Sequence, residues 1–464
     1  MSNGQAPHCE GSYQALMPDV RMTSAARGCP EPGHGNARAG AAPGLISPRT
    51  VLPAARRSDG LVLKRGAGRW SLLAGCVVAA SAWGQTSDRP WTLTAAQNVT
   101  HESNVLGSVR GSEQSDTVLT TSLAGGLDLP LGRQRAYANA SFNHQRYRQL
   151  DARNNDGYAL VAGLDGSTIE RLAGGIKFNA NRRQADFNVG GVTPVSVSNI
   201  ERSEELAVNL SLGGRGLLGL DAGAGQRQVS FSATEYAAQE YVQDSARVGL
   251  AIRPSALLAL SLGLGGDHTR FLAAATGQSA AERSRRRDVY ASAVWVPNGL
   301  STVSLRLASS RVRYERAAAS NFDGLTGSLA WTWKPSGKLA LTTTMTRDTG
   351  QESGFLRLNG GNAVSATDFS QLSNSQSLRV SYELTGKLTL STGLLGVQRS
   401  FVDGTSAVSS VDRTESVTLG LRWAATRTLA LVCSSVHEVR TSSSVRLPSY
   451  SSNRFGCSGQ LSLD

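Results

Sequence analysis

One pattern recurs along most of this chain: short segments in which apolar and small polar side chains alternate with a period of two. It begins near Trp91 and continues to the end of the chain, with clear examples at 206–212, 258–264 and 417–423. A period of two places successive side chains on opposite faces of a β-strand. The pattern therefore predicts many strands, each apolar on one face and polar on the other.

The connections between these segments alternate between short and long. The short ones contain Pro, Gly or Asn, as at 130–132, 297–299 and 335–337, and these residues favour tight turns. The longer polar connections cover 101–115, 185–203, 270–285, 348–375 and 400–414. This layout is typical of an outer-membrane β-barrel, which has short periplasmic turns and long extracellular loops.

We therefore expect an all-β fold: a transmembrane antiparallel up-and-down β-barrel over residues 85–464, in the bacterial outer membrane. The segments give about 18 strands, with 16 as the other count that fits, and an even number is typical of such barrels. A soluble β-propeller or solenoid is the alternative for repeated hairpins. Those folds need a fixed repeat length, whereas the spacing here varies with the loops.

Aromatic residues gather at the predicted strand ends. The tryptophans expected at the periplasmic ends are Trp91, Trp295, Trp331, Trp333 and Trp423. The aromatic residues expected at the opposite ends are Phe142, Tyr147, Phe178, Tyr314 and Phe401. Two such groups predict the aromatic belts that mark the two membrane interfaces.

Composition excludes several other classes. No apolar run reaches the roughly 20 residues that a transmembrane helix needs, and 5 Cys in 464 residues are too few for a disulfide scaffold. The formal net charge is +12, of which residues 1–84 carry +5 because nine Lys and Arg face four Asp and Glu. The remaining excess of +7 is mild, so a nucleic-acid partner is not expected.

The N-terminal part does not follow the strand pattern. Residues 1–60 are rich in Pro, Gly, Ala and Arg without periodicity, which indicates a disordered segment or translation upstream of the true start. Residues 61–84 combine basic residues, a short apolar stretch and small residues at the end, the composition of a secretory signal peptide. Cys76 within this stretch offers an alternative lipidation site, although few apolar residues precede it.

The polar face of the strands is expected to line the barrel interior. Its basic candidates are Lys177, Arg247, Arg306, Arg379 and Arg422. A barrel of this size leaves a water-filled lumen unless loops plug it, and a basic wall favours anionic solutes. The alternative is that each of these residues is simply a solvated charge paired across the lumen.

Two cysteines fall on the last two predicted strands. Cys433 and Cys457 lie symmetrically about the loop between them, so a hairpin would place them opposite each other, where a disulfide can form. The alternative is two small lipid-facing residues. Metal-ligand spacings are absent, and Ser141 and His144 alternate to opposite faces of one strand. We therefore expect no metal site, no cofactor and no enzymatic activity.

The two ends of the barrel region carry short motifs. Near the start are Thr100-His101-Glu102-Ser103-Asn104, Ser115-Asp116-Thr117 and Gly132-Arg133-Gln134-Arg135, and near the end is Tyr450-x-x-Asn453-x-x-Gly456-Cys457-Ser458. The chain thereby resembles the outer-membrane β-barrels encoded in exopolysaccharide operons (the EpsL type), within the broader β-barrel porins. One departure is the end of the chain, where the terminal aromatic residue usual in barrel proteins is missing.

The resemblance implies a function in exopolysaccharide biosynthesis or export, with the barrel as a conduit for the polymer. Its implied partners are exopolysaccharide and other components of a polysaccharide secretion system, beside the outer-membrane lipid. Two alternatives remain: a general porin for small solutes, and a plugged barrel that binds ligands with its surface loops, notably 348–375.

Overall fold

The structure is a computed structural model that describes residues 90–168, 171–185, 199–213, 216–274, 280–316, 321–349, 372–402, 409–443 and 448–463. The predictions for segments 1–60 and 61–84, including Cys76, lie outside the described residues. Within these ranges, no helix is long and apolar enough to cross a membrane.

Eighteen strands make up most of the described chain. They are β1 (Trp91–Glu102), β2 (Asp116–Leu131), β3 (Gln134–Tyr147), β4 (Asn155–Ser167), β5 (Leu172–Gln184), β6 (Ile200–Leu212), β7 (Leu218–Phe231), β8 (Tyr241–Ser255), β9 (Leu258–Phe271), β10 (Arg283–Asn298), β11 (Ser301–Tyr314), β12 (Phe322–Trp333), β13 (Leu339–Asp348), β14 (Leu372–Thr385), β15 (Leu388–Val402), β16 (Ser409–Ala424), β17 (Leu429–Ser442) and β18 (Tyr450–Leu463). Two short 3₁₀ turns, Asp151–Arg153 and Thr234–Gln239, lie in the connections after β3 and β7.

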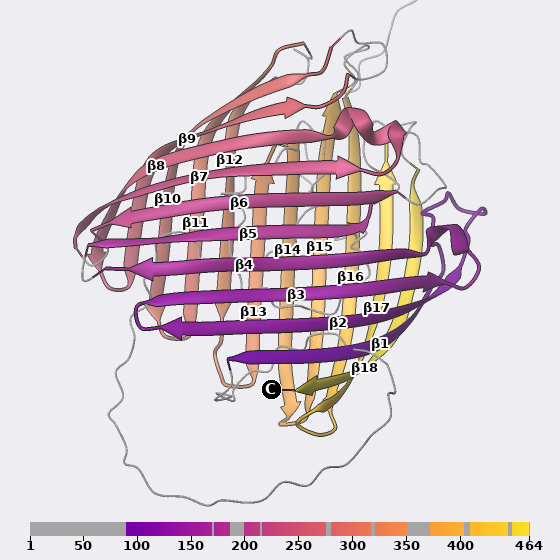
Figure 1. Cartoon of the computed structure of the whole chain (residues 1–464). Helices are drawn as coiled ribbons and strands as arrows, with labels where there is room; N and C mark the ends of the chain where they lie inside the picture. Colours follow the sequence, from indigo (N-terminus) through magenta and orange to yellow (C-terminus); the bar gives the residue numbers. More distant parts are fainter. Residues whose placement is uncertain are drawn as a thin grey trace, which may run out of the picture.

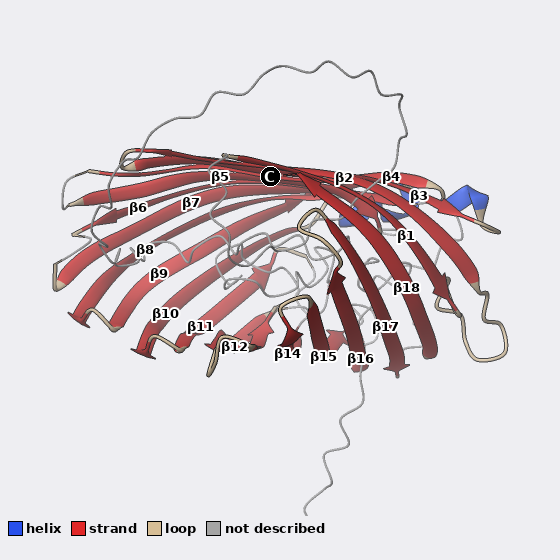
Figure 2. Ribbon diagram, turned by 90° about the horizontal axis from the view of Figure 1, so that it is seen from below, coloured by secondary structure: helices blue, strands red, loops and turns tan. Residues whose placement is uncertain are grey.

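The strands form one closed sheet. Each strand pairs with the next along the chain, and β18 pairs antiparallel with β1, from Leu93 opposite Leu463 to Glu102 opposite Arg454. In Figure 1 the strands of the near wall run across those of the far wall behind them. Figure 2 shows β1 and β18 side by side, seen from below. The predicted antiparallel up-and-down barrel is confirmed, with 18 strands.

Short and long connections lie at opposite ends of the barrel, as predicted. At the short-turn end, Gly132 between β2 and β3 has a φ of 67°, a left-handed conformation that glycine adopts without steric cost. At the long-loop end, Asp116 accepts hydrogen bonds from the backbone N–H groups of Gln149 and Leu150 (3.1 and 3.0 Å). The loop after β3 is thereby fixed to the start of β2.

The outward face of the sheet is apolar over the half nearer the short turns. Leu262 is 63% exposed and lies opposite Leu250, which is 52% exposed, while Leu307 and Leu419 continue the same surface on other strands. So large an exposed apolar surface is unfavourable in water, and a closed sheet has no unpaired edge, as a lipid bilayer requires. The chain is therefore a transmembrane barrel of the bacterial outer membrane.

The predicted tryptophan belt at the short-turn end is confirmed. Trp91, Trp295, Trp333 and Trp423 are exposed on the outward face near this end. Trp331 stacks against Trp333 with ring centroids 5.8 Å apart, and its indole N–H donates a hydrogen bond to Ser301. The belt fixes the depth of this end of the barrel at the periplasmic interface.

The second predicted belt is only partly correct. Phe142 lies on the outward face and is exposed, but Tyr147 is buried and its ring packs under Arg153 at 5.1 Å. Tyr314 pairs with buried Ser284 and Phe401 pairs with Ser410, both at inward positions. Tyr147, Tyr314 and Phe401 thus lie at the predicted strand end, but their positions in the strand alternation turn them to the inside of the barrel.

Candidate functional site

The inward face of the barrel wall is the candidate site. The structure places all five predicted basic residues at inward positions, because the residues on either side of each in its strand belong to the outward face. Lys177 lies on β5, Arg247 on β8, Arg306 on β11, Arg379 on β14 and Arg422 on β16. They are spread around the wall and do not converge on one point.

Acidic residues occupy inward positions about as often as basic ones. Those facing inward include Asp128, Asp165, Glu205, Asp221, Asp267, Asp288, Asp348, Glu383, Asp412 and Glu438. The described inner wall is therefore balanced in charge, and not basic as the sequence suggested. Selection for one sign of charge would have to come from local clusters, because the wall as a whole favours neither.

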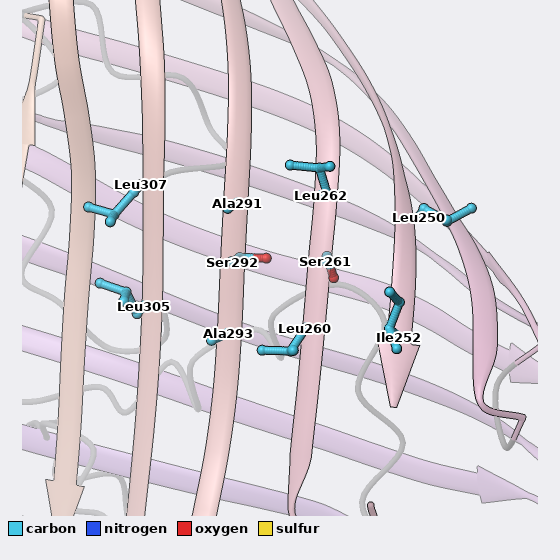
Figure 3. A pocket seen from close by; sticks show the side chains of 10 residues that line it. All are labelled: Leu250, Ile252, Leu260, Ser261, Leu262, Ala291, Ser292, Ala293, Leu305 and Leu307. Atoms are coloured by element: carbon cyan, nitrogen blue, oxygen red, sulfur yellow. The ribbon is translucent and has the colours of Figure 1, made fainter. Parts of the chain in front are cut away.

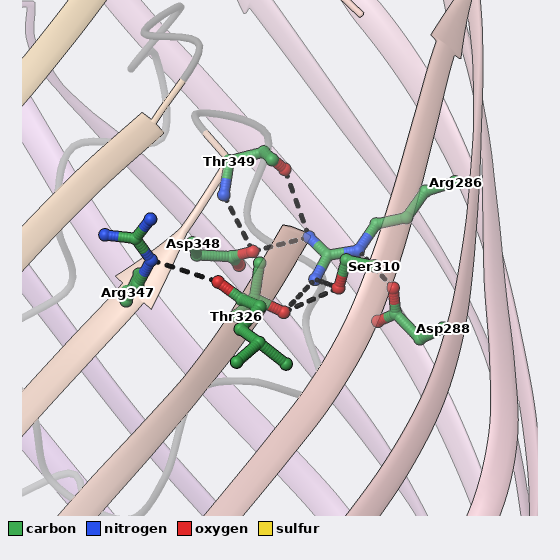
Figure 4. Close-up of polar contacts among 8 residues, drawn as sticks. Arg286, Asp288, Ser310, Thr326, Arg347, Asp348 and Thr349 are labelled. Atoms are coloured by element: carbon green, nitrogen blue, oxygen red, sulfur yellow. Dashed lines mark hydrogen bonds and ion pairs between the residues drawn. The ribbon is translucent and has the colours of Figure 1, made fainter. Parts of the chain in front are cut away.

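The most connected inward cluster is centred on Arg286 of β10 (Figure 4). Its guanidinium pairs with Asp288 on the same strand at 2.9 Å and with Asp348 at the end of β13 at 2.6 Å. The side chains of all three are buried, at 5% exposure or less. Its second Nη donates hydrogen bonds to the hydroxyls of Ser310 and Thr326, both at 3.2 Å. The cluster thus joins β10, β11, β12 and β13 across the inner face.

Similar charge pairs occur around the long-loop end. Arg440 donates two hydrogen bonds to Asp412, at 2.7 and 3.0 Å, and Arg399 approaches the same carboxylate at 3.5 Å. On the opposite part of the wall, Arg183 pairs with buried Glu201 at 2.9 Å. Charges near this end are thus compensated by opposite charges on the same or adjacent strands.

Tyr290 of β10 lies flat against the wall. It is opposite Gly263 in register, and a Cβ at Gly249 would lie 2.7 Å from its hydroxyl. The guanidinium of Arg306 lies 3.7 Å from the ring centroid, within the distance of a cation–π interaction. Arg306 Nε is buried without a hydrogen-bond partner among the described residues. The two glycines leave the space that the ring occupies.

Tyr137 on β3 shows the same arrangement. It is opposite Gly163 of β4, whose Cβ would lie 2.5 Å from the ring. Arg135 lies 5.3 Å from the ring centroid and also pairs with Asp128 through two hydrogen bonds of 2.7 Å. Both sites combine an inward glycine, a cross-strand tyrosine and an arginine over its ring. The sequence signal was present as Gly at inward positions, but it identifies no partner without the register.

The two predicted cysteines lie opposite each other on β17 and β18. Their sulfurs form a disulfide, with 4.0 Å between the Cα atoms. Both side chains are on the outward face, because Cys433 is also opposite outward Leu421 of β16. The disulfide is therefore outside the lumen and takes no part in the candidate site.

Other chemistry-bearing residues do not assemble into a site. His144 is outward and its Nδ1 contacts Asp156 at 2.7 Å, while Ser141 faces inward on the same strand. His437 likewise contacts Asn453 on the neighbouring strand at 2.7 Å. Over the described ranges, no group of three or more His, Cys, Asp and Glu side chains could hold a metal ion.

No protein-family model and no curated protein matches the sequence. Among solved structures, the barrel is similar to OccK2 (OpdF) of Pseudomonas aeruginosa at 15% identity and a TM-score of 0.43, covering 81% of this chain and 98% of that one. It is similar to the Pseudomonas aeruginosa outer-membrane protein OpdK at 14% identity and a TM-score of 0.42, covering 80% and 98%. It is also similar to the FrpB iron transporter of Neisseria meningitidis, at 10% identity and a TM-score of 0.42. That match covers 77% of this chain but only 62% of the length of FrpB.

Proposed function

We propose that this barrel is an outer-membrane transport channel that passes small hydrophilic solutes. The observation that carries the proposal is the closed sheet of 18 strands with an apolar outward face and a polar, charged inward face. Barrels of 16–18 strands are wide enough for an aqueous lumen. Because both signs of charge line the wall, the channel discriminates weakly between small anions and cations.

Lys177, Arg379 and Arg422 are the cations best placed to meet a solute. All three are half-buried inward residues, and the Nε of Arg422 has no hydrogen-bond partner among the described residues. A solute carrying a carboxylate or several hydroxyl groups could accept hydrogen bonds from them.

The test is planar-bilayer recording of the full-length protein purified from outer membranes. We expect steady conductance, with a reversal potential near zero in a KCl gradient. Replacing Lys177, Arg379 and Arg422 by Ser should shift the reversal potential towards cation selectivity. The matched control replaces three outward residues, Arg146, Arg182 and Arg202, and should leave it unchanged. A folded barrel that carries no current would contradict the channel proposal.

The resemblance of the two chain ends to exopolysaccharide-operon barrels supports a more specific proposal, that the cargo is exopolysaccharide and the partners are other components of its secretion system. No contact among the described residues favours a polymer over a small solute, so this proposal rests on the motifs alone. Addition of the host's purified polysaccharide to the recording chamber separates the two. Block of the current by the polymer would support the conduit, and unchanged current would favour the general porin.

A further inference from the structure

A run of arginines at the start of β10 is divided between the two faces of the wall. Arg286 faces inward and is paired, as described above, whereas Arg283, Arg285 and Arg287 alternate to the outward face. These three side chains are exposed and have no hydrogen bond or ion pair with any described residue. Three unpaired cations thus project from one strand on the outside of the barrel.

Neighbouring strands add more arginines beside them. Arg283 lies opposite Arg270 of β9, Arg285 opposite Arg313 of β11, and Arg287 opposite Arg311 of β11. We call these six residues the arginine patch.

Only two acidic side chains pair with the arginine patch among the described residues. Asp244 contacts Arg270 at 3.0 Å, and Asp323 is shared by Arg311 and Arg313. The patch therefore keeps a clear positive excess. On β6, four strands from β10, the same outward zone forms a mixed side, since Arg202 pairs there with Glu204.

The patch lies at the depth of the outer lipid headgroups. On β10, Trp295 marks the periplasmic interface, and Val289, 54% exposed, is the last outward apolar residue before Arg287. Eight residues separate Trp295 from Arg287, or about 26 Å along an extended strand. With the usual strand tilt this rises about 20 Å, close to the roughly 25 Å height of the apolar band of such barrels. Arg285 and Arg283 continue through the headgroup zone.

Directly below the patch, the apolar surface contains a groove (Figure 3). On β10 the outward residues are the small Ala291 and Ala293, whereas β9 and β11 present leucines at the same level. The groove lies along β10, and Ala291 is four residues from Arg287, about 13 Å. Its lining includes Leu260, Leu262, Leu305 and Leu307. Its shape and polarity suit a hydrocarbon chain.

We propose that the outward surface of β9–β11 binds a phosphorylated, acylated glycolipid of the outer leaflet. Its phosphate groups pair with the arginine patch, since guanidinium binds phosphate through two parallel hydrogen bonds. One of its acyl chains occupies the groove over Ala291 and Ala293. The charge and the groove lie on the same strand at the spacing of a headgroup and its chain, which an anionic surface alone would not require.

The test is native mass spectrometry of the full-length protein in a neutral detergent, titrated with diphosphorylated lipid A. The variant Arg283→Ser/Arg285→Ser/Arg287→Ser should bind lipid A with a dissociation constant at least about tenfold higher, because each cation near an anionic lipid surface contributes to binding. The matched control, Arg146→Ser/Arg182→Ser/Arg202→Ser, removes the same charge from the mixed side and should bind as the unmodified protein does.

Two further comparisons separate headgroup from chain. Ala291→Leu fills the groove and should weaken binding of lipid A without affecting binding of its deacylated, still phosphorylated headgroup. Excess inorganic phosphate should fail to displace lipid A. Three outcomes would each overturn the proposal. The patch variant and its control could lose lipid A binding equally, or the patch variant could bind lipid A as tightly as the unmodified protein. The unmodified protein could also bind dephosphorylated lipid A as tightly as the phosphorylated form. All the substitutions are on the outward face, and unchanged circular dichroism confirms folding.

Discussion

Replacement of Arg286 by Met tests whether the buried cluster stabilises the barrel. The substitution leaves the carboxylates of Asp288 and Asp348, with side chains 5% and 2% exposed, without their central cation. Removing one partner of a buried ion pair costs about 3–5 kcal/mol, because a desolvated charge remains uncompensated. The lost hydrogen bonds to the hydroxyls of Ser310 and Thr326 act in the same direction. We therefore expect the free energy of unfolding to fall by about 3–5 kcal/mol.

The assay is equilibrium unfolding by urea in neutral detergent micelles, followed by tryptophan fluorescence and extrapolated linearly to zero denaturant. Arg287→Met is the matched control, since Arg287 is the next residue on the same strand but faces outward, exposed and without a partner among the described residues. Its effect should stay within about 0.5 kcal/mol. Converting both carboxylates to amides in the Arg286→Met background should recover about 2 kcal/mol, because the two buried charges that had lost their cation are then removed. Equal effects of the two single substitutions, or no recovery in the combined variant, would refute the reasoning.

Two other predictions concern stability. Breaking the Cys433–Cys457 disulfide, which closes a sequence separation of 24, should lower the free energy of unfolding by up to about 3 kcal/mol. Urea unfolding with and without reductant measures this loss, and free thiols located at Cys433 and Cys457 in the oxidised protein would contradict the pairing. Gly263→Ala should destabilise the barrel by about 1–3 kcal/mol, because its Cβ would meet the backbone oxygen of Val248 and the ring of Tyr290; Gly396→Ala, with nothing within 4 Å of its Cβ, should have little effect in the same assay.

The alternation of side chains was sufficient to predict the class of fold and the end of the barrel at which each connection lies. The prediction succeeds because each strand of a membrane barrel faces lipid on one side and the interior on the other, so apolar and polar residues alternate along the sequence. Trp295 and Trp423 also indicate where the strands meet the membrane interface, because tryptophan is enriched at that depth.

The inward clusters could not be predicted, because they depend on strand register and on contacts between distant residues. Arg286 and Asp348 are separated by 62 residues and meet only across three strand pairings. Tyr147 lies at the predicted strand end but faces inward, because it is an odd number of residues from outward Phe142 on the same strand. The arginine run at 283–287 forms a patch only through its outward members and the arginines opposite them, and charge counts along the chain do not separate the two faces.

The outward disulfide between β17 and β18 has a consequence for how the barrel closes. A hairpin can slip by two residues and still keep its apolar side chains on one face, so hydrophobicity alone does not select a single pairing. A covalent bond between Cys433 and Cys457 excludes every slipped pairing. Strand β18 is also the strand that meets β1, so its position fixes the stagger of the final seam. The disulfide thus fixes the register of β18, and in a reduced chain several registers of β18 against β17 and β1 compete during closure of the barrel.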